Sequence, residues 1–119
     1  MIDDIKFIKI AVSVSELEYY ADSPHWTVRC EVAKNPFAAS SVLFKLAHDT
    51  RWEVQAYVVE NPNADYDTFA YVLENGKTDA LWYLAKSPYA PKDIAQKAWE
   101  KYLCGKNTGI TYSGNYQAV

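Results

Sequence analysis

The 119-residue sequence is poor in the residues that build common cofactor and metal sites. Two cysteines, Cys30 and Cys104, are too few for a four-ligand metal site. Four glycines are present and Gly76 stands alone, so there is no glycine-rich phosphate loop. No HExxH motif, histidine pair or carboxylate cluster has metal-ligand spacing. We therefore expect no cofactor, no metal ion and no catalytic residues.

The sequence also lacks a strong charge of either sign and a long apolar run. Lysine and arginine number 12 against 15 acidic residues, a net charge of −3, which argues against nucleic-acid binding by phosphate neutralisation. No run approaches the ~20 apolar residues of a membrane span. The acidic start does not resemble a secretory signal. These features predict a cytoplasmic protein with reduced thiols.

The chain does contain enough apolar residues, 50%, for one buried core, and it repeats itself. Asn35-Pro36, Asn61-Pro62 and Ser87-Pro88 follow one another at intervals of 26 residues, and the residues around them keep the same register. Each interval has room for two short helices. The repeat is therefore the most informative feature of the sequence.

One helix is predicted before each of these prolines. Ser23, Asp49 and Asn75 share a column and are expected to be its N-caps, with Pro24 at a first helical position. The residue before the proline is expected to end the helix in the left-handed conformation, which asparagine tolerates. The expected core columns of this helix are Val28, Val54 and Ala80, then Val32, Val58 and Leu84, then Ala33, Val59 and Ala85.

A second helix fits between each proline and the next cap. Ser15, Ser41, Asp67 and Asp93 lie near its start, where an oxygen or a negative charge meets the positive end of the helix dipole. Its expected core columns are Leu17, Leu43, Phe69 and Ala95, then Tyr20, Leu46, Val72 and Ala98, then Ala21, Ala47, Leu73 and Trp99.

Because neither helix can bury its apolar face alone, the units must stack. The sequence thus predicts an all-α fold, a short right-handed α-solenoid of about three and a half two-helix repeats. Residues 1–14 are expected to form an N-terminal capping segment, either a helix or a strand, and residues 15–104 the helical repeat domain. Residues 105–119 change composition and suggest a flexible tail or a marginal hairpin.

The repeat resembles a known family on the following residues: Val28-Arg29, Val32-Ala33-Lys34-Asn35-Pro36, Val42-Leu43, Leu46-Ala47 and Asp49. They are similar to the variant leucine-rich repeat, a bacterial helical repeat that is HEAT-like in shape. The resemblance covers about residues 15–103, with Gln55 and Leu81 where the family pattern has arginine. It implies alternating short helices, no catalytic residues and a role as an interaction scaffold. Some members hold an iron–sulfur cluster, which two distant cysteines do not match.

Aromatic residues, at 15%, are the surplus that points to a function. Exposed tryptophan and tyrosine are typical anchors of protein interfaces, although they can also wrap the edges of a thin core. We expect a non-enzymatic scaffold, adaptor or inhibitor, of bacterial or phage type, that binds another protein through Trp26, Arg29, Glu31, Trp52, Gln55, Tyr57 and Tyr83.

Three further expectations concern partners and rival functions. An imperfectly capped solenoid end allows either a monomer or a homodimer. A HEAT-like protein that binds nucleic acid is the first alternative function. A small thiol-dependent hydrolase that uses Cys30, His48 and Asp49 is the second and less favoured one. Arg29 is expected to pair with an acid such as Asp22 or Asp49 rather than with a ligand.

Overall fold

The apolar spacing produces seven α-helices over residues 14–106, the part of the chain that the computed structural model describes, and no strand occurs within that range. The helices are α2 (Val14–Tyr20), α3 (Trp26–Lys34), α4 (Ser40–Leu46), α5 (Trp52–Val59), α6 (Tyr66–Asn75), α7 (Thr78–Lys86) and α8 (Lys92–Lys106). The predicted all-α class is confirmed.

The helices begin at regular intervals along the chain. The even-numbered helices α2, α4, α6 and α8 start 26 residues apart, and so do the odd-numbered helices α3, α5 and α7. The predicted acidic or hydroxyl residues Ser15, Ser41, Asp67 and Asp93 are each the second residue of an even-numbered helix. The even-numbered helices therefore begin where the sequence predicts them to begin.

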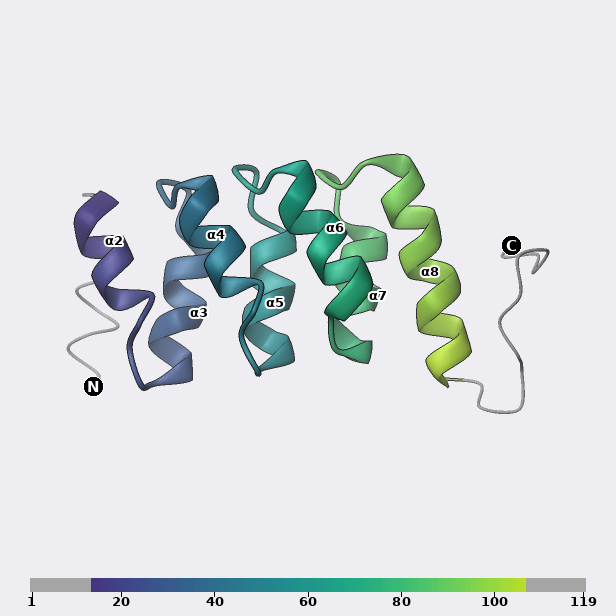
Figure 1. Cartoon of the computed structure of the whole chain (residues 1–119), viewed down its shortest axis with the longest axis horizontal. Coiled ribbons are helices and arrows are strands. Elements are labelled where there is room, and N and C mark those ends of the chain that lie inside the picture. The colour runs from purple at the N-terminus through teal and green to yellow at the C-terminus, as the bar shows by residue number, and fades with distance from the viewer. Residues whose placement is uncertain (1–13, 107–119) are drawn as a thin grey trace.

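The helices stand side by side in two rows, as Figure 1 shows. In the row behind, α5 packs between α3 and α7, and in the front row α6 packs between α4 and α8. The C-terminal helix α8 also packs closely against α7, which closes that end of both rows. The described residues therefore form one compact all-α unit with its core between the rows.

Most residues of the predicted core columns are buried between the rows, whereas Tyr20, Leu73, Ala85 and Trp99 are only half-buried. Val28, Val54 and Ala80 are all 0% exposed, and so are Val32, Val58 and Leu84. In the even-numbered helices, Leu17, Leu43 and Phe69 are buried. The fourth residue of their column, Ala95, is only half-buried. In α8 the buried positions are Ile94 and Ala98, so Ile94 takes the core position that the sequence predicted for Ala95.

The predicted N-caps at Ser23, Asp49 and Asn75 are wrong. The odd-numbered helices begin three residues later, and the residues at their N-cap positions, His25, Arg51 and Lys77, make no side-chain cap hydrogen bond. The Ser23 and Asp49 oxygens instead accept the backbone N–H two residues ahead, at 3.1 and 2.9 Å. Short polar side chains favour such local turns over helix. The third predicted cap, Asn75, is the last residue of α6, and Pro24 precedes α3 rather than starting it.

The proline corners also differ from the prediction. Asn35 and Ser87 have extended backbone, with φ of −74° and −65°, and no residue of the described range has positive φ. A following proline excludes helical backbone at the preceding residue, which explains the extended conformation. The Asn35 and Ser87 side chains accept the backbone N–H of Phe37 and Tyr89 and thereby form the turn.

Side chains at the proline corners also join neighbouring helices of the back row. Buried Asn61 donates through Nδ2 to the carbonyl oxygens of Ala33 and Asn35, at 2.8 and 2.9 Å. Ser87 Oγ donates to the carbonyl oxygen of Val59 at 2.6 Å. Each bond joins the end of one odd-numbered helix to the end of the previous one. These side chains hold successive helices in register.

The two ends of the chain are described only in part. The predicted capping segment falls almost wholly on residues 1–13, and most of the predicted tail falls on residues 107–119, which lie outside the described residues. The helix α8 continues to Lys106, two residues past the predicted end of the helical domain. Trp99 stacks on Tyr102 with ring centroids 5.8 Å apart, both half-buried at this end of the core.

Candidate functional site

In the candidate thiol site, Cys30 is buried, and His48 and Asp49 each contact another side chain. Cys30 is 6% exposed, and burial, aided by the carboxylates of Glu53 and Asp49, raises the pKa of its thiol to about 11. His48 stacks on Tyr71 with ring centroids 3.8 Å apart, and Asp49 is bound by arginine. A protonated, buried thiol is a poor nucleophile, so the burial of Cys30 opposes its activation.

Within residues 14–106, no group of three or more histidine, cysteine, aspartate or glutamate side chains is placed to hold a metal ion. Within the same range, no helix combines the length and the apolar character that crossing a bilayer requires.

The seven predicted partner-binding residues all lie on the back row, on α3, α5 and α7. Six of them are half-buried and one is fully buried. Six of them divide into an arginine-centred group around Trp26, a central pair of α3 and α5 side chains, and an aromatic group near α8. The seventh, Gln55, is buried.

Arg29 is part of an ion pair rather than a free cation. Its Nε donates to Asp49 Oδ2 at 2.6 Å and its Nη1 donates to the carbonyl oxygen of Ser23 at 2.8 Å. The predicted pairing with an acid is thus confirmed for Asp49. The guanidinium is held against the loop that precedes α5, which makes Arg29 a structural residue.

Trp26 is covered by a second arginine. The guanidinium carbon of Arg51 lies 3.9 Å from the centroid of the Trp26 ring, a close cation–π contact. Arg51 also reaches Glu53 at 3.3 Å. Both arginines of this end of the row are therefore engaged within the chain.

Gln55 is the one predicted contact residue that the structure removes from the surface. It is 3% exposed, its Nε2 donates to the carbonyl oxygen of Ala47, and its Oε1 accepts the backbone N–H of Lys77, both at 3.0 Å. Gln55 stands at the same repeat position as Arg29, and its side chain joins the loops before α5 and α7 instead of reaching solvent. In the sequence, Gln55 looks like a polar residue on the outer face of an amphipathic helix, so its burial could not be predicted.

Glu31 and Tyr57 lie at the middle of the row. Lys34 connects them, since its Nζ is 3.2 Å from Glu31 Oε2 and 5.1 Å from the centroid of the Tyr57 ring. Lys34 is exposed, so both contacts are made in water and contribute little to stability. These side chains form a small polar and aromatic patch between α3 and α5.

The third group forms an aromatic hollow of about 400 Å³ where α5, α7 and α8 meet. We define it by its lining residues, which are Trp52, Asp79, Trp82, Tyr83 and Tyr102. Trp52 stacks on Tyr83 at 5.9 Å with the ring planes 20° apart, while Trp82 meets Tyr83 edge-on at 5.1 Å and 78°. Two of the seven predicted residues thus belong to one concave site.

Sequence reasoning missed three residues of the aromatic hollow, Asp79, Trp82 and Tyr102. The sequence does contain a signal for Trp82. It stands at the same repeat position as Cys30 and Ala56, whose small side chains are both buried. A tryptophan cannot enter the same space, so it extends outward and is 37% exposed. Asp79 on α7 and Tyr102 on α8 meet at the hollow because these two helices pack closely. The periodicity of the sequence does not predict this packing.

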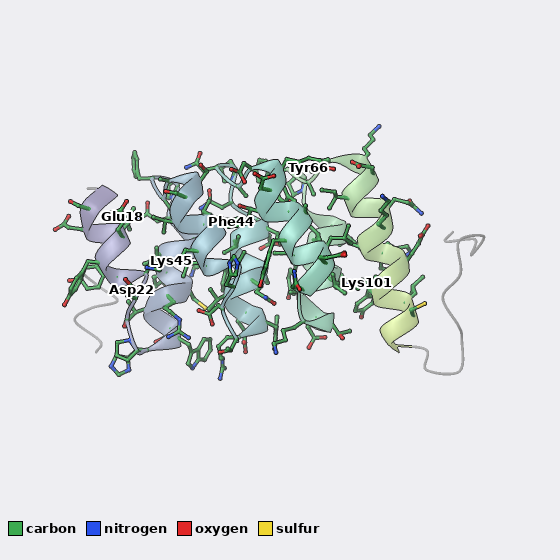
Figure 2. All side chains as sticks on the ribbon, viewed as in Figure 1. Glu18, Asp22, Phe44, Lys45, Tyr66 and Lys101 are labelled. Carbon is green, nitrogen blue, oxygen red and sulfur yellow. The ribbon has the colours of Figure 1, made fainter. Side chains whose placement is uncertain are left out.

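The front row carries a smaller aromatic cluster. Phe44 lies edge-on to Tyr71 at 6.0 Å, and His48, which stacks on Tyr71, donates through Nδ1 to the Phe44 carbonyl oxygen at 2.9 Å. Figure 2 shows Phe44 and Lys45 on α4 and Lys101 on α8 in this row. Lys101 Nζ donates to the carbonyl oxygens of Leu73 and Glu74 and thereby caps the end of α6.

Comparisons with known proteins identify no relative of the chain. No protein-family model matches it, no curated protein matches it significantly, and neither does any solved structure.

Proposed function

We propose that the chain is a short right-handed α-solenoid, HEAT-like and similar to variant leucine-rich repeat proteins, that binds a protein partner without catalysing a reaction. The regular helix starts and the equal burial of Val28, Val54 and Ala80 support the stacked architecture. The bonds from Asn61 and Ser87 to the preceding helix support it too, since both span 28 residues. Such stacks use their surface rather than a buried cleft.

The observation that carries the binding function is the aromatic hollow on the back row. It places two tryptophans and two tyrosines around one concavity, and these residue types dominate the energetics of protein interfaces. Trp82 is 37% exposed at a repeat position whose other members, Cys30 and Ala56, are small and buried, so part of its ring is available to a partner. We propose that Trp52, Trp82 and Tyr83 anchor the partner.

The rival functions have less support. Nucleic-acid binding needs cations that are free to neutralise phosphates, whereas Arg29 and Arg51 of this row are paired with carboxylates. A thiol hydrolase needs an activated thiolate, and the burial of Cys30 opposes its ionisation.

Affinity capture with the tagged chain from cells of its source organism tests the proposal. Trp82→Ala is compared with Phe44→Ala, which removes an aromatic ring of almost equal exposure, 38% against 37%, from the opposite row. We expect Trp82→Ala to reduce the recovered partner at least about fivefold, the scale of an interface hot spot, and Phe44→Ala to leave it unchanged. Equal recovery with wild type and Trp82→Ala would place the interface elsewhere.

A further inference from the structure

We propose that Asn75 is a site of spontaneous deamidation, and that the last turn of α6, fastened by Lys101, holds the reaction back in the folded protein. Asn75-Gly76 is the one Asn-Gly pair of the sequence. Asparagine is a thermolabile residue, and a following glycine favours the reaction because it has no Cβ to hinder ring closure. Asn75 is exposed at the end of α6, so water reaches its side chain. This inference is independent of the proposed function.

The chemistry of the site involves only the chain and water. The backbone nitrogen of Gly76 loses its proton to water or hydroxide and forms a bond to Cγ of Asn75. The bond from Cγ to Nδ2 breaks, and ammonia leaves with a proton from the solvent. Water then opens the resulting five-membered succinimide at either carbonyl, which gives aspartate or isoaspartate at position 75. One water is consumed, one ammonia is released, and a neutral amide becomes a carboxylate.

The packing of α6 requires a glycine after this asparagine. A Cβ at residue 76 would lie 2.5 Å from the carbonyl oxygen of Val72 and 2.8 Å from its Cγ1. Because every other residue type carries a Cβ, the fold excludes the bulkier neighbours that slow ring closure. The labile pair is therefore imposed by the structure around it.

The same corner restrains the groups that must react. The backbone N–H of Gly76 donates to the carbonyl oxygen of Val72 at 2.7 Å. The nitrogen must give up this proton before it can attack, so the last turn of α6 has to open first. The side chain of Asn75 is held less firmly, since its Nδ2 donates to the carbonyl oxygen of Tyr71 at 3.4 Å, a long bond at an exposed position.

Lys101 of α8 fastens the last turn of α6 from outside. Its Nζ donates to the carbonyl oxygens of Leu73 and Glu74, at 2.7 and 3.0 Å, and these are the two residues before Asn75. A cation at this end of a helix also meets the negative end of the helix dipole. Lys101 is exposed, so the two bonds can break in water. They determine how often the end of α6 opens.

The product should weaken the corner in which it forms. A carboxylate at residue 75 adds negative charge beside Glu74, at the negative end of the α6 dipole. Isoaspartate also inserts a methylene into the main chain, two residues before Lys77. The backbone N–H of Lys77 donates to buried Gln55 at 3.0 Å, so a displaced corner strains this bond. A deamidated chain should therefore unfold at a lower temperature than the unmodified one.

Incubation of the chain at mildly alkaline pH, with and without guanidinium chloride, tests the inference. Peptide mapping by mass spectrometry identifies aspartate and isoaspartate at each position. We expect residue 75 to be the main site of reaction in the denaturant, and its reaction to be at least about tenfold slower in the folded protein, where only the open fraction reacts. Asn63 is the internal control, because it is exposed but precedes alanine, and it should react far more slowly in the denaturant.

Two lysine variants separate the restraint from the charge. Lys101→Met removes the bonds to the end of α6 and should speed deamidation of the folded protein at least about threefold. Lys97→Met removes the same charge from an exposed position one turn earlier on α8 and should leave the rate unchanged. Asn75→Gln should give no product at residue 75. Circular dichroism establishes that each variant is folded.

Three results would overturn the inference, each at a different step. Absence of a product at residue 75 in the denaturant would remove the site. Equal rates in the folded and the unfolded chain would show that α6 does not restrain the reaction. Equal rates for Lys101→Met and Lys97→Met would exclude Lys101 as the group that fastens the helix end.

Discussion

Arg29 and Asp49 lie 20 residues apart and join α3 to the loop before α5 through two hydrogen bonds, Nε to Oδ2 at 2.6 Å and Nη2 to Oδ1 at 3.2 Å. Their side chains are 18% and 6% exposed. Asp49 also accepts the backbone N–H of Arg51, and Arg29 also donates to the carbonyl of Ser23. The pair therefore connects two loops and one helix in the back row.

Removing one member of this pair should destabilise the protein substantially. Arg29→Met leaves the carboxylate of Asp49 buried without its cation, and we expect a loss on the order of 2 kcal/mol in the free energy of unfolding. Urea denaturation followed by circular dichroism measures it. Lys45→Met is the control, because Lys45 pairs with Asp22 at an exposed position and should change stability by less than about 0.5 kcal/mol. Equal effects of the two variants would contradict a structural role for Arg29.

The buried amide of Asn61 should matter more than an exposed one nearby. Asn61→Ala removes donors from the carbonyls of Ala33 and Asn35 and an acceptor from the N–H of Asn63, so we expect a loss of about 2 to 3 kcal/mol. Asn63→Ala removes two donated bonds that water can replace, because Asn63 is exposed, and should cost about 1 kcal/mol or less. Thermal unfolding of both variants checks the order, and a larger loss for Asn63→Ala would disprove it.

Gly76 ends α6 at a point with no room for a side chain. A Cβ at this position would lie 2.5 Å from the carbonyl oxygen of Val72 and 2.8 Å from its Cγ1. We therefore expect Gly76→Ala to shift the backbone and destabilise the protein by about 1 to 2 kcal/mol. Gly105→Ala in α8 is the control. Its Cβ would lie 3.4 Å from Thr78 Cγ2, an ordinary contact, so the protein should keep its stability or gain up to about 1 kcal/mol from the helix propensity of alanine. Chemical denaturation distinguishes the two.

The buried thiol of Cys30 predicts a loss of stability in alkali. Its pKa is raised from 9.0 to about 11, so between these pH values the unfolded chain has lost a proton that the folded protein retains. The free energy of unfolding must then fall as pH rises from about 9 to 11, by an amount on the order of 2 kcal/mol. Cys30→Ala should remove this part of the slope, whereas Cys104→Ala should keep it. Denaturation curves at several pH values give the difference between variant and wild type.

The helices and the core were predictable because both depend on local periodicity. A recurring interval in the sequence marks Val32, Val58 and Leu84 as equivalent, and all three are buried as expected. The ends of the helices were less predictable. Ser23 and Asp49 are good cap residues by type, yet they form loop turns, because a local side-chain bond to the backbone is available there too.

The candidate site was predictable only in part. Trp52 and Tyr83 share no column, and their stacking arises from the offset between neighbouring helices, which periodicity does not specify. Gln55 shows the opposite failure: a side chain that looks suited to a surface is enclosed by the carbonyl of Ala47 and the N–H of Lys77. Both errors arise where loops and helix ends, rather than helix faces, decide which groups meet.

The order of the helices in the two rows affects how the protein can form. The main contacts that the structure describes join helices that are adjacent or next-but-one along the chain, such as α3 with α5 and α6 with α8. Chains whose contacts are local in sequence fold fast, since little loop-closure entropy opposes each step. During synthesis on a ribosome, each newly emerged helix therefore finds its packing partners already outside the exit tunnel, and the protein can acquire its structure from the N-terminal side as it is translated.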